Sequence, residues 1–74
     1  MTVLLRPNDA LRQYTGGRPE VRVEAGRTVL ETLSALGIPS TLVAVVVVND
    51  EQQPKDYVLK DGDRVRILAV IGGG

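Results

Sequence analysis

The chain has 74 residues, a formal net charge of zero, no cysteine and no histidine. This length makes a single domain, and the missing residue types exclude disulfides, Cys/His zinc sites and histidine-based catalytic triads. The balanced charge argues against nucleic acid as the main partner, and the twelve Val, nine Leu and three Ile must supply the core.

Two strands joined by an irregular connection are predicted for the first part of the chain. Residues 2–6 are strand-like, and Pro7 ends the run. Residues 8–18 form a connection with one helical turn followed by a glycine pair. Residues 20–24 then alternate strictly, which places Val21 and Val23 inward.

One helix is predicted in the middle of the chain. Thr28 and Glu31 match a capping box at its start, and Gly37 fits the left-handed position after its end. Four apolar residues recur at helical spacing and form one stripe: Val29, Leu30, Leu33 and Leu36.

The remainder of the chain is predicted to form strands. Residues 43–48 are β-branched and suit a central strand, and the polar segment 49–56 is a loop or a short edge pairing. Gly62 supplies the turn before a last strand over residues 64–71. The predicted fold is therefore α+β, a β-grasp with a mixed four- to five-stranded sheet and one main helix.

In such a sheet the first and last strands pair in parallel, so their outward residues become neighbours. Leu4, Arg6, Arg66 and Leu68 then share the face away from the helix. Apolar residues bordered by arginine suit docking of a partner, although scattered surface leucines are also ordinary. Asp61 and Asp63 around the turn glycine are interpreted as turn residues rather than metal ligands.

Three glycines, Gly72, Gly73 and Gly74, follow the last strand. Without a Cβ, such a tail can enter a narrow tunnel of a partner, and no side chain shields its terminal carboxylate. Loose glycine-rich ends also occur without any function. We expect a folded domain over residues 1–71 and a flexible tail over residues 72–74.

Three segments together resemble the ubiquitin-like sulfur carriers: Val48–Glu51, Leu59–Val65, and the strand containing Ile67 and Leu68 with the diglycine. That family includes the thiamine sulfur carrier, the small subunit of molybdopterin synthase and the carrier of an alternative cysteine route. The resemblance covers essentially the whole chain. Its most specific element is the Asp-Gly-Asp turn combined with the final strand and the diglycine.

The resemblance implies a shared chemistry. A ubiquitin-activating-type enzyme would adenylate Gly74 with ATP and magnesium, and sulfur would then convert it to a thiocarboxylate that is donated in molybdopterin, thiamine or cysteine biosynthesis. Gly73 would complete the diglycine. Gly72, Val70 and Ile71 would contact partners together with Leu68, Arg66, Leu4 and Arg6.

The chain itself would be no enzyme and would bind no cofactor or metal. Its expected partners are the activating enzyme, a sulfur donor of the desulfurase or rhodanese type and a sulfur-acceptor synthase. We expect no nucleic-acid or membrane partner, a monomer when free, and a cytoplasmic location, because no apolar run is long enough to span a bilayer.

Two alternatives to the sulfur carrier remain open at the level of sequence. One is a ubiquitin-like modifier joined to lysines through Gly74, and the other is a β-grasp interaction module with an inert tail. The cues to a pathway also conflict. The short spacing from Asn49 to Asp61 favours the molybdopterin type, whereas residues 14–17 and 48–51 favour the cysteine-pathway carrier.

Overall fold

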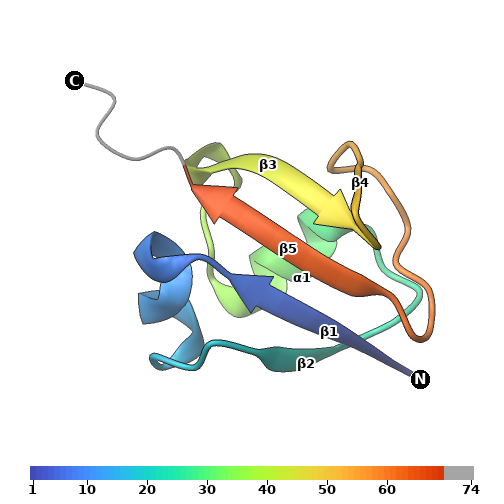
Figure 1. Cartoon of the computed structure of the whole chain (residues 1–74), viewed down its shortest axis with the longest axis horizontal. Helices are drawn as coiled ribbons and strands as arrows, with labels where there is room; N and C mark the ends of the chain where they lie inside the picture. Colours follow the sequence, from blue (N-terminus) through green and yellow to red (C-terminus); the bar gives the residue numbers. More distant parts are fainter. Residues whose placement is uncertain (70–74) are drawn as a thin grey trace.

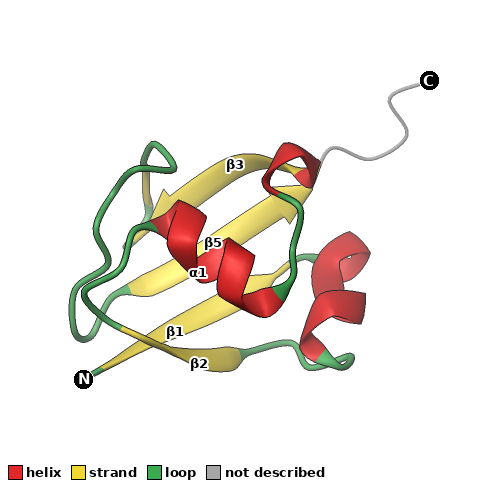
Figure 2. Cartoon of the chain, turned by 180° about the vertical axis from the view of Figure 1, so that it is seen from behind, coloured by secondary structure: helices red, strands yellow, loops and turns green. Residues whose placement is uncertain are grey.

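A computed structural model describes residues 1–69, and residues 70–74 lie outside the described part. It has a five-stranded sheet with one α-helix packed across one face (Figures 1 and 2). In chain order the elements are β1 (Thr2–Pro7), the 3₁₀ helix η1 (Asp9–Thr15), β2 (Val21–Glu24), α1 (Val29–Leu36), the 3₁₀ helix η2 (Ser40–Leu42), β3 (Val43–Val48), β4 (Glu51–Gln52) and β5 (Arg64–Ala69).

The strands are arranged in the order β2-β1-β5-β3-β4. The first and last strands, β1 and β5, pair in parallel, and the other neighbours are antiparallel. This arrangement confirms the predicted β-grasp. It also places β5, the strand that leads to the C-terminus, at the centre of the sheet between β1 and β3 (Figure 1).

Helix α1 begins and ends where its caps predict. Thr28 Oγ1 accepts from the Glu31 N–H at 3.1 Å, and the Glu31 carboxylate accepts from the Thr28 N–H at 2.9 Å. Gly37 ends the helix at φ 75°, a conformation that glycine adopts without strain.

The predicted apolar stripe of α1 was wrong at Leu30, which is 47% exposed. Successive helical residues are about 100° apart, so Leu30 lies about 100° from Val29 and about 60° from Leu33, at the border of the buried stripe. Thr32 occupies the buried face instead, and its hydroxyl donates to the Thr28 carbonyl at 3.0 Å. A hydroxyl satisfied in this way can be buried at little cost.

The core lies between α1 and the sheet. Alternate residues of β1 and β5 point into it and are buried, as the period-2 pattern predicts, with Ala69 at the end of β5 only half-buried. Val21 and Val23 of β2 pack against its edge, which confirms their predicted inward orientation. The buried apolar residues are Val3, Leu5, Leu11, Val29, Leu33, Ile38, Val43, Val46, Val48, Leu59, Val65 and Ile67.

Strand β3 is interior but lies next to a very short edge, because β4 pairs only with Val47 and Val48. Its register with β5 shifts between Val43 and Val45, which leaves Ala44 as an exposed extra residue. This bulge reverses the alternation, so that Val43 is buried while Val45 remains on the opposite face.

The last strand was predicted to continue to Ile71. The described part of β5 ends at Ala69, and Val70 and Ile71 lie outside the described residues. The predicted domain boundary after residue 71 therefore stays a prediction.

Candidate functional site

The sheet face opposite α1, here called the outer face, is turned toward the viewer in Figure 1. It carries four of the predicted docking residues. Arg6 lies opposite Arg66 in the parallel pair of β1 and β5. Leu4 lies two residues earlier, opposite Arg64. Leu68 follows Arg66 on the same face. The predicted neighbourhood of these residues is confirmed, whereas their binding of a partner stays a prediction.

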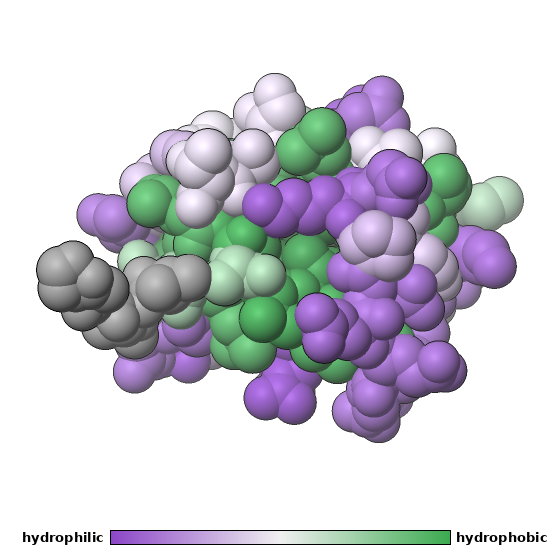
Figure 3. Space-filling model, turned by 90° about the horizontal axis from the view of Figure 1, so that it is seen from above, coloured by the Kyte–Doolittle hydropathy of each residue, from purple (hydrophilic) through white to green (hydrophobic). Residues whose placement is uncertain are grey.

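Half-buried aliphatic residues form the middle of the outer face. Val45 lies opposite Leu68, and Val47 lies opposite Arg66, so both valines join Leu4 there. Figure 3 views the molecule from its β3 edge, where apolar residues gather in the middle and polar ones border them. A contiguous apolar area on a small domain is typical of a docking surface.

Arginine dominates the charge of the outer face. Arg6 Nε lies 3.4 Å from Glu20 Oε1 in an exposed ion pair. Arg66 makes no ion pair within residues 1–69, although it lies directly opposite Arg6. Like charges opposite each other in a sheet are destabilising, so nothing in the fold itself favours this pair.

A groove of about 580 Å³ opens where β1 and β5 end beside η1. The main-chain N–H of Asn8 donates to the Ile67 carbonyl at 3.1 Å, and this bond fixes the start of η1 against β5. The groove is lined by Arg6, Pro7, Asn8, Asp9, Arg12, Pro19, Arg66 and Leu68.

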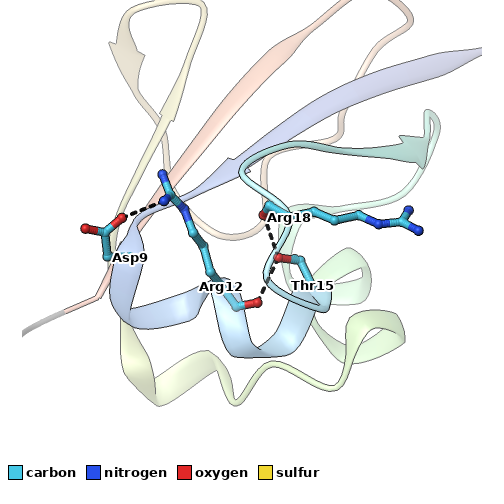
Figure 4. A network of polar contacts seen from close by, with 4 residues as sticks. All are labelled: Asp9, Arg12, Thr15 and Arg18. Carbon is cyan, nitrogen blue, oxygen red and sulfur yellow. Dashed lines mark hydrogen bonds and ion pairs between the residues drawn. The ribbon is translucent and has the colours of Figure 1, made fainter.

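Sequence reasoning placed Arg6, Arg66 and Leu68 in this region but missed Asn8, Arg12 and Pro19. These three lie in the connection after β1, and no local signal indicates that it turns back beside β5. Within η1, Arg12 pairs with Asp9 at 2.8 Å, and the Thr15 hydroxyl donates to the Arg12 and Arg18 carbonyls at 3.1 and 2.8 Å (Figure 4).

Two of the segments that resemble the sulfur carriers meet in a polar cluster, here called the Asn49–Asp63 clasp. The Asn49 amide donates to Asp63 Oδ1 at 2.9 Å, and Asn49 Oδ1 accepts from the Arg64 N–H at 3.0 Å. Asp63 Oδ2 accepts from the Lys60 N–H at 2.9 Å and from the Tyr57 hydroxyl at 3.3 Å. The clasp therefore ties the β3–β4 turn to the start of β5.

The clasp keeps the nearly buried Asp63 carboxylate ionised. Burial by itself raises the pKa of Asp63, but the hydrogen bonds from Lys60, Asn49 and Tyr57 outweigh it and hold that pKa below its usual value. Burial, followed by the neighbouring Asp63 charge, raises the pKa of Tyr57. Both shifts follow from burial and from the contacts within the clasp itself.

The other carboxylate of the Asp-Gly-Asp turn is structural as well. Asp61 Oδ1 accepts from the Thr2 N–H at 2.8 Å, and Gly62 between the two carboxylates has φ 87°. The interpretation of this motif as turn chemistry is therefore confirmed. Residues 1–69 contain no group of three or more carboxylate, Cys or His side chains that could bind a metal ion.

Five of the predicted site residues cannot be placed, because Val70, Ile71, Gly72, Gly73 and Gly74 lie outside the described residues. No helix among residues 1–69 is both long and apolar enough to cross a membrane.

Comparisons with known proteins agree with this fold. The model of the ThiS family matches residues 6–74. The chain is 34% identical to a protein in the crystal structure of the Amycolatopsis orientalis BexX/CysO complex, with a TM-score of 0.70 over 97% of this chain and 99% of that one. No curated protein sequence gave a significant match.

Two further solved structures are similar over the full length of both chains. A chain in the complex of subunits 1 and 2 of the molybdopterin-converting factor from Helicobacter pylori is 25% identical, with a TM-score of 0.61. SAMP1 from Haloferax volcanii is 21% identical with a TM-score of 0.72, a likeness that concerns the fold alone.

Proposed function

Because the chain belongs to the ThiS family, we propose that it is a sulfur carrier whose C-terminal Gly74 is adenylated and then converted to a thiocarboxylate. Like the small carriers of this family, it is not itself an enzyme. The observation that supports the proposal most strongly is that the family match continues through the diglycine to residue 74.

The proposed chemistry needs a partner, because a carboxylate is a poor acyl donor until it is activated. An oxygen of the Gly74 carboxylate attacks the α-phosphorus of ATP and releases pyrophosphate, while magnesium offsets the phosphate charge. The terminal sulfur of a persulfide then attacks the acyl carbon, and AMP leaves. A second thiol cleaves the resulting sulfur–sulfur bond, which leaves the thiocarboxylate and a disulfide.

The domain contributes position rather than catalysis. β5 is fixed by β1 on one side and by β3 on the other, so the chain after Ala69 starts from a rigid point. A partner that binds Leu68 and Val45 on the outer face therefore meets this starting point in a fixed orientation. Such positioning raises the effective concentration of the reacting end at the partner's active site.

We expect protein partners both for the activation of Gly74 and for the transfer of sulfur. The 34% identical relative is seen in a complex with BexX, and the 25% identical relative is seen in a complex between two subunits of the molybdopterin-converting factor. By analogy, we propose that this chain meets an activating enzyme of the ubiquitin-activating type, a sulfur donor and a sulfur-acceptor protein. The molybdopterin, thiamine and cysteine routes each supply a different candidate activating enzyme, and each enzyme is tested separately.

The test is the intact mass of the full chain after incubation with an activating enzyme from each route, ATP, magnesium and a persulfide source. We expect a mass gain that corresponds to exchange of one oxygen for sulfur, with no gain when ATP is omitted. Absence of this gain with all three enzymes would reject the sulfur carrier. Higher-mass conjugates in cell extract, lost when Gly74 is deleted, would favour the protein modifier.

A further inference from the structure

We propose that the groove between β1, β5 and η1 binds an acidic segment of a protein partner, whose Asp or Glu carboxylates contact Arg6, Arg12 and Arg66. The inference deepens the proposed function, on which it rests for the expectation of a protein partner. It adds the chemistry of that partner and a site beside the reactive end.

Three arginines from three different elements line this groove. The arginine fork matches the geometry of a carboxylate, which accepts two parallel hydrogen bonds from it. Arg6 and Arg66 lie opposite each other across neighbouring strands, where their like charges repel. A carboxylate placed between them would remove this repulsion.

The internal ion pairs of the groove are weak competitors for such a ligand. The Arg6–Glu20 pair has side chains that are 63% and 44% exposed, and those of the Arg12–Asp9 pair are 42% and 88% exposed. Exposed pairs of this kind contribute little to stability, so an incoming carboxylate can replace them at little cost. Within residues 1–69, Arg66 has no ion pair to lose.

Two polar atoms at the groove lack hydrogen-bond partners within the described residues. Arg12 Nε, a donor, and Asn8 Oδ1, an acceptor, are both buried without a partner. Arg12 extends toward Asp9, in the direction opposite to the Arg18 side chain (Figure 4). A peptide offers a carboxylate for Arg12 and a main-chain N–H for Asn8.

Apolar walls distinguish the groove from a simple anion site. Pro7, Pro19 and Leu68 line it together with the arginines. Its volume of about 580 Å³ lies in the usual range of roughly 300–1,000 Å³ for ligand pockets. The carbon atoms of an acidic peptide would contact these walls, whereas a phosphate ion would leave them in water.

The test is an NMR titration of the ¹⁵N-labelled full chain with the peptide Glu-Asp-Leu-Asp-Glu, acetylated and amidated at its ends. At low salt we expect saturable shifts of the amides of Asn8, Arg12 and Leu68, weakened by added salt. Arg66→Gln should lower the affinity at least about fivefold. Arg27→Gln is the matched control, because Arg27 pairs with Glu24 away from the groove and its loss should change nothing.

Several results would overturn the inference. One is equal shifts from the neutral peptide Gln-Asn-Leu-Asn-Gln, and another is equal shifts from inorganic phosphate at the same ionic strength, which would indicate a general anion site. A third is movement of the Gly74 amide resonance on Arg66→Gln in the free protein, which would assign the groove to the chain's own carboxylate. Because the titration needs no activating enzyme, its failure is separate from a failure of thiocarboxylate formation.

Discussion

Replacing Asp63 by asparagine tests whether the Asn49–Asp63 clasp stabilises the fold. The carboxylate is 7% exposed and accepts three hydrogen bonds. Asparagine keeps the shape, but its single oxygen can accept only part of them, and its amide then faces another donor. A hydrogen bond to a charged group contributes about 1.5–3 kcal/mol, so we expect a loss of about 2–4 kcal/mol.

This loss is large for so small a domain. At about 0.05–0.15 kcal/mol per residue, the 74 residues have a total stability of roughly 4–11 kcal/mol. The free energy of unfolding is measured by urea denaturation, followed by circular dichroism at about pH 7. The control is Asp56→Asn, an exposed carboxylate whose neutralisation should change stability by no more than about 0.5 kcal/mol.

The lowered pKa of Asp63 also predicts how the stability difference between parent and Asp63→Asn changes with pH. The folded pKa of Asp63 is lowered, so its stabilisation is present above the unfolded pKa of about 3.9 and is lost as the pH falls through the folded pKa. The difference between parent and Asp63→Asn should therefore shrink as the pH falls below the unfolded pKa of about 3.9. A difference within about 0.5 kcal/mol at neutral pH, or one that stays constant on acidification, would refute the reasoning.

The other predictions concern the outer face, the tail and a turn. Leu68→Asp should weaken binding of the activating enzyme by more than about 1 kcal/mol in calorimetry, whereas Leu30→Asp on α1 should not, although both replace a leucine. Gly73→Val should abolish ATP–pyrophosphate exchange by that enzyme while leaving the urea midpoint unchanged, and equal exchange would favour an inert tail. Asp50→Gly should stabilise the fold by about 0.5–1 kcal/mol in urea, because Asp50 has φ 70°, and a loss of stability would contradict this.

Local signals were sufficient for most of the secondary structure. The alternation in β1 and β5 depends only on the two faces of a strand, and the capping box at Thr28 closes within four residues. The left-handed Gly62 also follows from the turn itself. Each of these features has its cause within a few residues of the chain, so each could be predicted from sequence.

Features that depend on tertiary pairing could not be predicted. The bulge at Ala44 exists because β3 must place both Val43 and Val46 in the core against β5, and a strict alternation allows only one of them. Arg12 reaches the groove because the Asn8 N–H bonds to β5, a contact between residues far apart in the sequence. No short stretch of the sequence indicates either of these pairings.

The motif residues that made the family recognisable turn out to be structural. Asn49, Asp61 and Asp63 hold the β3–β4 turn, the N-terminus of β1 and the start of β5 in place through their hydrogen bonds. The fold needs residues with this role whichever partner the chain binds, so they do not discriminate between the proposed pathways. The choice of partner must then depend on exposed side chains that a partner can contact. These are the side chains of the outer face and of the groove between β1, β5 and η1.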